Sequence, residues 1–228
     1  MTPNPATTPP KAPTLVIDGS GSAVFAGVLD QDGNWLSKSE FDGTPLESLF
    51  PAVEATLVTA QISLSDLRSF IYCEGPGSVL GLRLCAMAIE TWSRLHPESA
   101  HYYAYNSLQL TAALICADTP GIDNALLVSD WKKGAWNAVK INQGEPGSTE
   151  VADDAMIAGW TGPLYHLPQR KGWQKPPVGA STVEYCPQRL AEALDQLKPT
   201  TGVELYASGI NVFQKWTPER HRAPTPQP

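Results

Sequence analysis

A glycine-rich turn has the spacing in this sequence that is most typical of a ligand site. It runs from Glu74 to Arg83, reads EGPGSVLGLR, and separates a predicted strand from a predicted helix. Three glycines and a proline at such a junction indicate a tight turn. Strand–glycine–helix junctions often bind anions, because the backbone N–H groups of the helix start point outward. Gly75, Gly77 and Ser78 are therefore candidates for facing a nucleotide or a phosphate.

Two residues weigh against a nucleotide at this turn and favour a structural role. Pro76 has no N–H, in a position where a pyrophosphate would need donors. The next predicted strand is followed by Asn106, and not by the acidic residue that would hold a ribose. No Lys-Ser or Lys-Thr pair follows Gly81, so the turn is not a Walker loop. We interpret it first as a close-packed junction in which Ser78 caps the helix.

A second polar turn, DGSGS, follows the first predicted strand and starts at Asp18. Turns of this type can bind phosphate or magnesium through backbone amides and a carboxylate, which makes Asp18 and Ser20 further candidates. The favoured alternative is a hairpin turn in which both side chains bond to their own backbone.

The remaining chemistry-bearing residues form no predicted catalytic constellation. His96 and His101 are five residues apart across a proline, so they cannot share a helix face as a metal pair does. The four cysteines are scattered and form no C-x-x-C pair. No G-x-S-x-G elbow is present. We therefore predict no catalytic residue, no metal ligand and no cofactor.

Composition limits the class of protein. The chain has 228 residues, a formal net charge of −7, 42% hydrophobic and 17% charged residues. The proportions of hydrophobic and charged residues are those of a globular protein. The negative net charge argues against a protein that binds nucleic acid on its own. The scattered cysteines suit a reducing compartment, and no apolar stretch approaches transmembrane length. We predict a cytoplasmic protein that does not contact a membrane.

The apolar patterns predict two lobes between two disordered tails, residues 1–13 and 218–228. The first lobe, residues 14–118, is predicted as three antiparallel strands followed by alternating helices and strands. The second lobe, residues 124–217, opens on a hairpin from Ala125 to Asn142. Residues 144–178 are rich in Trp, Pro and Gly and give no clear prediction. A helix over Gln188–Leu197, a last strand over Val203–Ala207 and a short closing helix are predicted to follow.

The glycine turn and the order of the elements resemble a known family. Glu74 to Arg83 resembles the GPGSFTGLR signature of the TsaB-type proteins, the non-catalytic, glycoprotease-like (peptidase M22-like) relatives of the subunit that makes threonylcarbamoyladenosine in tRNA. Leu15 to Ser20 (LVIDGS) is similar to that family's opening LAIDTS. Leu127 to Gly134 is similar to its AIDARMGE segment. The resemblance implies an α/β, actin/sugar-kinase/chaperone-like (ribonuclease H-like) two-lobed fold, with a second lobe that is reduced or divergent.

The same resemblance implies a function without a catalytic residue. The chain would be a scaffold or accessory subunit in tRNA processing, supporting the threonylcarbamoyladenosine modification of adenosine 37. Its implied partners are the catalytic TsaD-type paralogue, as a heterodimer, and an ATPase subunit of the TsaE type. It would contact tRNA only indirectly and could form a homodimer when isolated. The alternative is a nucleotide-binding enzyme of the actin/sugar-kinase superfamily, which would need a second glycine-rich phosphate turn.

The family pairs through the first two helices of its first lobe, here Pro45 to Ala60 and Val79 to Leu95. Apolar residues on two faces would let the second helix pack on its own sheet and on a partner at once. The alternative is a fully buried core helix. The implied interface comprises Leu46, Leu49, Phe50, Val53, Leu80, Leu84, Met87 and Trp92.

Overall fold

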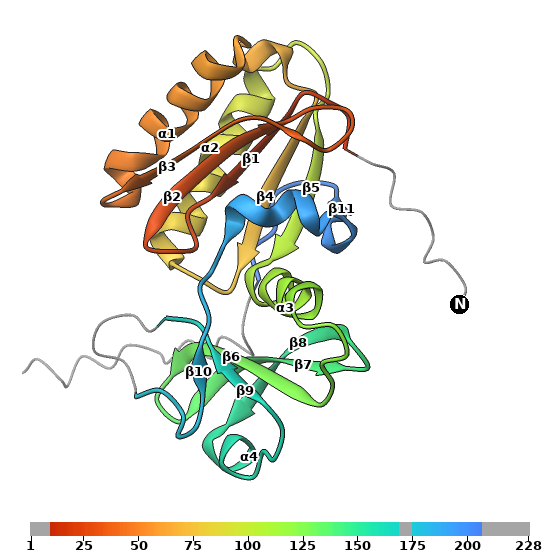
Figure 1. Cartoon of the computed structure of the whole chain (residues 1–228). Coiled ribbons are helices and arrows are strands. Elements are labelled where there is room, and N and C mark those ends of the chain that lie inside the picture. Colours follow the sequence, from red (N-terminus) through yellow and green to blue (C-terminus); the bar gives the residue numbers. More distant parts are fainter. Residues whose placement is uncertain (1–9, 169–174, 207–228) are drawn as a thin grey trace, which may run out of the picture.

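Strand β1 (Thr14–Asp18) lies inside the larger of two sheets and sets the plan of the first lobe. A computed structural model describes residues 10–168 and 175–206 of the chain (Figure 1). The larger sheet has the strand order β11-β5-β4-β1-β2-β3. β1 pairs antiparallel with β2 and parallel with β4, and β4 pairs parallel with β5. The other bounds in this sheet are β2 (Ala23–Leu29), β3 (Trp35–Asp42), β4 (Ser69–Gly75), β5 (His101–Asn106) and β11 (Lys198–Thr200).

Helices cover both faces of this sheet. The side chains of β1 alternate: Leu15 and Ile17 face the core under α1 (Pro45–Ala60) and α2 (Val79–Leu95), whereas Val16 faces the opposite core. The opposite core is covered by α3 (Ser107–Asp118) and by the short 3-10 helices η2 (Pro187–Glu192) and η3 (Leu194–Gln196). Burial on both faces explains why the central strands are continuous apolar runs.

The start of α1 follows from its local sequence. Thr44 occupies the N-cap position with an extended backbone, and Pro45 follows at the first position of the helix. Thr44 and Glu47 form a reciprocal capping box. The helix ends at Gln61, which has a left-handed backbone with φ of 58°. The helix predicted to begin at Thr44-Pro45 is confirmed.

The second lobe is built on a smaller sheet with the order β10-β9-β6-β7-β8. The predicted hairpin is confirmed as β6 and β7, and the segment that gave no clear prediction contains β8, α4 and β9. Helix α3 covers one face of this sheet, and α4 packs on the other. The bounds are β6 (Ala125–Lys132), β7 (Ala135–Asn142), β8 (Glu145–Asp153), α4 (Asp154–Ala158), β9 (Leu164–His166) and β10 (Ser181–Thr182). Within the described residues, no helix is both long and apolar enough to cross a membrane.

The chain then returns to the first lobe, which corrects three predictions. The helix predicted over Gln188–Leu197 is instead the two 3-10 helices η2 and η3. The last strand is β11, which pairs antiparallel with β5, and the strand predicted over Val203–Ala207 is wrong for its described part. Residues 187–200 therefore pack on the first lobe, so the predicted second lobe of 124–217 extends too far. The predicted closing helix and most of both tails lie outside the described residues.

Candidate functional site: the interlobe cleft and the outer helix face

The two glycine-containing turns meet each other at the end of β1. The backbone N–H of Ser78 donates to the carbonyl of Ser20 at 2.8 Å. A Cβ on Gly81 would lie 1.9 Å from the carbonyl oxygen of Gly19, and one on Gly77 would lie 2.4 Å from the Cβ of Ser20. No larger residue could occupy these two positions without moving the backbone. The glycines therefore allow the start of α2 to lie directly against the β1–β2 turn.

The other members of the glycine turn have local roles. Ser78 caps α2, and its Oγ accepts from the N–H of Gly81 at 3.3 Å, which confirms the capping predicted for it. Gly75 has a φ of 114°, which side chains rarely tolerate, and an added Cβ would meet Leu82 at 3.1 Å. Gly75 thus allows the tight turn between β4 and α2 to pack closely against Leu82.

A cleft of about 730 Å³ lies between the lobes beside these turns. Four of the five predicted turn residues line it: Asp18, Ser20, Gly77 and Ser78; Gly75 is not among the lining residues. Ser129 and Asp130 line it from the second lobe, and Tyr185 lines it from the segment that returns to the first lobe. The structure therefore brings the two turns together at one cleft, whose volume is in the range of small-molecule pockets.

Asp18 is the most buried charged group at this cleft, with 1% of its surface exposed. One carboxylate oxygen accepts from the N–H of Ser20 at 2.6 Å. The other accepts short hydrogen bonds from the hydroxyls of Tyr105 and Tyr185. Burial, reinforced by the nearby Asp18 charge, holds the pKa of both tyrosines well above the usual value. Both hydroxyls therefore stay protonated and remain donors to the carboxylate.

The charge of the lining limits what the cleft can attract. Carboxylates of Asp18, Glu40, Asp130 and Glu184 lie along it together with several serines, and the described lining residues include no lysine or arginine. A surface of one sign raises the local concentration of the opposite sign, so these groups favour cations over phosphates. The described part of the chain contains no group of three or more His, Cys, Asp or Glu residues arranged to hold a metal ion.

The sequence missed the residues that come to this cleft from a distance. Tyr185 is 167 positions from Asp18 and lies in a segment where no helical or strand pattern predicts its location. Tyr105 donates to the same carboxylate. Its position in a strand is predictable from the sequence, but the alternation of inward and outward side chains along β5 does not predict that its hydroxyl bonds to Asp18.

The outer face of α1 and α2 carries the second candidate site. The predicted interface residues are exposed, half-buried or buried. Four are exposed: Leu46 (66%), Phe50 (60%), Leu80 (50%) and Met87 (63%). Leu84 and Trp92 are half-buried. Val58 and Val79, which were not predicted, are exposed on the same helices.

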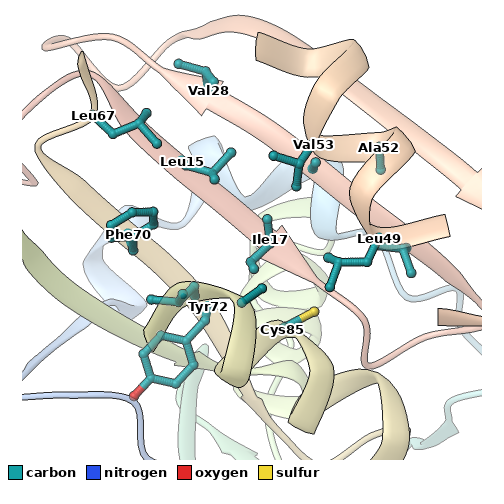
Figure 2. Close-up of a cluster of buried hydrophobic side chains, with 14 of the residues drawn as sticks. Leu15, Ile17, Val28, Leu49, Ala52, Val53, Leu67, Phe70, Tyr72 and Cys85 are labelled. Atoms are coloured by element: carbon teal, nitrogen blue, oxygen red, sulfur yellow. The ribbon is translucent and has the colours of Figure 1, made fainter. Parts of the chain in front are cut away.

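Leu49 and Val53 are corrections to the predicted interface. Both are almost completely buried and pack with Leu15 and Ile17 between α1 and the sheet (Figure 2). They are four residues apart and share the inner side of α1, whereas Phe50 directly follows Leu49 and is therefore rotated by about 100° toward solvent. These two side chains hold the helix on the sheet and are not available to a partner.

The exposed and half-buried members of the predicted interface are the outer apolar residues of α1 and α2, which we call the α1–α2 apolar face (Leu46, Phe50, Leu80, Leu84, Met87 and Trp92). Phe50 of α1 meets Trp92 of α2 edge to face, with ring centroids 6.3 Å apart. Trp92 in turn stacks against the buried Phe70 at 6.4 Å. The contact between Phe50 and Trp92 therefore joins the two helices and ties the surface to the core.

The order of strands and helices, the two sheets and the cleft define a two-lobed α/β protein. Two solved structures share this architecture at low sequence identity. YeaZ from Pseudomonas aeruginosa is 19% identical, with a TM-score of 0.57, over 79% of this chain and 89% of its own. An uncharacterized protein with similarity to peptidase YeaZ, from the same organism, is 18% identical, with a TM-score of 0.57, over 85% of this chain and 98% of its own.

These likenesses confirm the fold that the TsaB-type resemblance implied. No protein-family model matches the sequence, and no curated protein matches it.

Proposed function

We propose that this chain is a TsaB-type accessory subunit, which binds a catalytic TsaD-type paralogue through the α1–α2 apolar face. It supports threonylcarbamoyladenosine modification of tRNA from that position and contributes no catalytic residue. The fold shared with YeaZ, the TsaB protein, and the GPGSVLGLR motif support this function. An ATPase subunit would join the complex, and tRNA would contact its other members.

The exposure of the α1–α2 apolar face is the observation that carries the proposal. Leu46 and Phe50 are one helical turn apart on α1, and Leu80, Leu84 and Met87 follow one stripe of α2. Four of these five side chains are at least half exposed. A contiguous apolar surface of this kind marks an interaction site, since its burial by a partner is favourable. A partner of related fold could supply a matching pair of helices.

Phe50 and Met87 are the best positions for a test. A glutamate at either place would put a charge into the buried centre of the complex, whereas both sites are solvent-exposed in the isolated chain. We expect Phe50→Glu and Met87→Glu each to weaken binding of the purified paralogue by about 30-fold or more. Isothermal titration calorimetry with the paralogue from the same organism measures the change.

Val151→Glu is the matched control, since Val151 is an exposed apolar residue on β8 of the second lobe. It should bind the paralogue like the wild-type chain. Val151→Glu and Met87→Glu should keep the wild-type melting temperature, whereas Phe50→Glu also loses the ring contact with Trp92 and should lower it slightly. The proposed function is wrong if the wild-type chain fails to bind the paralogue at micromolar concentrations. The proposed surface is wrong if binding is intact in both helix variants.

A further inference from the structure

The segment that leads from the second lobe back to the first crosses beside the cleft. We call residues 183–187 the return strap; in Figure 1 it is the stretch that runs from β10 to the blue helical segment on the first lobe. At one end, the N–H of Val183 donates to the carbonyl of His166 at 3.0 Å, and the neighbouring Thr182 pairs with the same histidine. At the other end, the carbonyl of Gln188 accepts from the indole N–H of Trp35 at 3.0 Å.

Tyr185 is the strap residue whose hydroxyl contacts both Asp18 and Cys73 of the first lobe. It donates to the buried Asp18 carboxylate and lies 3.8 Å from the sulfur of Cys73. Its ring packs against the first-lobe core beneath the β1–β2 turn. Tyr185 therefore lies above Cys73 and fills the space beside Asp18 that a ligand of that carboxylate would need.

We propose that Tyr185 is an internal latch. Its hydrogen bond to Asp18 holds the return strap against the first lobe, closes one wall of the cleft and keeps Cys73 covered. The latch is independent of the proposed accessory function, because it joins two parts of the isolated chain. A ligand that binds the Asp18 carboxylate must first displace the tyrosine, because Tyr185 fills the space beside Asp18 in the latched state.

Three observations support a latch at this position. The contact joins the strap to a group on β1, the strand inside the larger sheet. The acceptor is a carboxylate, and hydrogen bonds to charged groups contribute more than neutral ones. The ends of the strap are tied to different lobes, at Val183 by the backbone of His166 and at Gln188 by the indole of Trp35. Release of Tyr185 therefore frees a short span without breaking the β9–β10 pairing.

Cys73 provides a native reporter of the latch. Its thiol is buried, as is that of Cys85, and burial raises the pKa of both. Cys73 lies beside Tyr185, whereas Cys85 lies on α2 in the core on the other side of the sheet. Of these two buried thiols, only that of Cys73 should become exposed when the strap opens, whereas unfolding of the first lobe should expose both.

The test is thiol labelling of the full chain with a maleimide, followed by peptide mass spectrometry to give a rate for each cysteine. Tyr185→Phe removes the hydroxyl and keeps the ring. We expect it to raise the labelling rate of Cys73 roughly tenfold or more, with no comparable change at Cys85. Burial raises the pKa of the Cys73 thiol, so it reacts slowly with a maleimide as long as the strap covers it.

Tyr105→Phe is the matched control. It removes the other tyrosine donor to the same carboxylate, but Tyr105 is held within β5 and does not belong to the strap. It should lower stability without selective labelling of Cys73. The latch is refuted if Tyr185→Phe leaves the Cys73 rate unchanged, if it accelerates Cys73 and Cys85 equally, or if Tyr105→Phe gives the same selective increase.

Discussion

The backbone of Gly81 packs directly against the backbone of Gly19, and this contact determines how α2 lies on β1. The clearance at Gly81 is too small for any side chain, because the carbonyl oxygen of Gly19 occupies the place of a Cβ. The same turn carries Asp18, so a shift of α2 would move the carboxylate that holds both tyrosines. The glycine turn thus fixes the geometry of this end of the cleft.

Gly81→Ala tests this role at the scale of one methyl group. The new Cβ would lie 1.9 Å from a backbone oxygen, so the helix or the turn must move. We expect a loss of about 3 kcal/mol in the free energy of unfolding, measured by urea denaturation. Gly202→Ala is the control, since nothing lies within 4 Å of its added Cβ, and it should change stability by less than about 0.5 kcal/mol. Equal effects of the two substitutions would contradict the close-packed junction.

The two sites differ in how far the sequence could predict their residues. The tight turn and the cap at Ser78 depend on residues within a few positions of each other, so the local pattern was sufficient. The burial of Leu49 was mistaken because its spacing fits both the inner and the outer side of α1. The Asp18–Tyr185 contact has no local signal, since it depends on the path of the whole chain.

At the scale of elements, Arg189 links the end of α3 to η2. Its guanidinium donates to both carboxylate oxygens of Asp118 at 2.7 and 2.8 Å, and also to Glu192. These hydrogen bonds hold the pKa of Asp118 and of Glu192 below their usual values. The Asp118 side chain is more than half exposed, so the contribution to stability is modest and sensitive to salt.

Arg189→Met should therefore lower the melting temperature slightly, and by an amount that depends on pH. A carboxyl whose folded pKa is depressed contributes stability above its unfolded pKa and loses it as the pH falls through the folded pKa. The difference from wild type should be present at pH 7 and should disappear at a pH below the usual values of 3.8 for Asp118 and 4.5 for Glu192.

Thermal unfolding followed by circular dichroism across this range measures the difference. Arg83→Met removes one exposed positive charge from α2 and is the control. A difference for Arg189→Met that stays constant down to pH 3 would show that the arginine acts through packing instead of through these carboxylates.

The elements that formed from strong local signals were predictable, whereas the returning segment was not. α1 has a capping box and an apolar face, and β4 is a short apolar run between turn residues. β11 contains Lys198 and Pro199, a pair that is typical of the end of a helix. It forms a strand because it pairs with the edge of β5. Edge pairing of this kind is tertiary and overrides local propensity.

At the scale of the whole molecule, the first lobe is completed by residues that follow the second lobe in the chain. Leu190, Ala193 and Leu197 are buried against the sheet face opposite α1 and α2. The same core contains Val16 and Tyr103. The first lobe is therefore discontinuous in sequence, and its second face stays open until the chain has crossed the second lobe and returned.

A chain truncated after Cys186 should not fold stably. It would lose the burial of Leu190 and Leu197, at about 1.5–3 kcal/mol for each large apolar side chain, and would expose the apolar groups they cover. This loss is a large part of a typical total stability of about 5–15 kcal/mol. We expect insoluble expression or loss of the cooperative thermal transition. A chain truncated after Tyr206 keeps these contacts and is the control. A wild-type melting temperature in the chain truncated after Cys186 would contradict the role given to the returning segment.

Helix α3 is buried on two sides, and this has a consequence for how such a protein can change over generations. Leu110 and Leu114 belong to the core of the first lobe, while Leu108, Ala112 and Ile115 belong to that of the second. A substitution that shifts α3 in the core of one lobe therefore also disturbs its packing in the core of the other lobe. The lobes are not modules that recombination could exchange separately. Residues of either lobe that pack on α3 are therefore constrained by the packing of the other lobe.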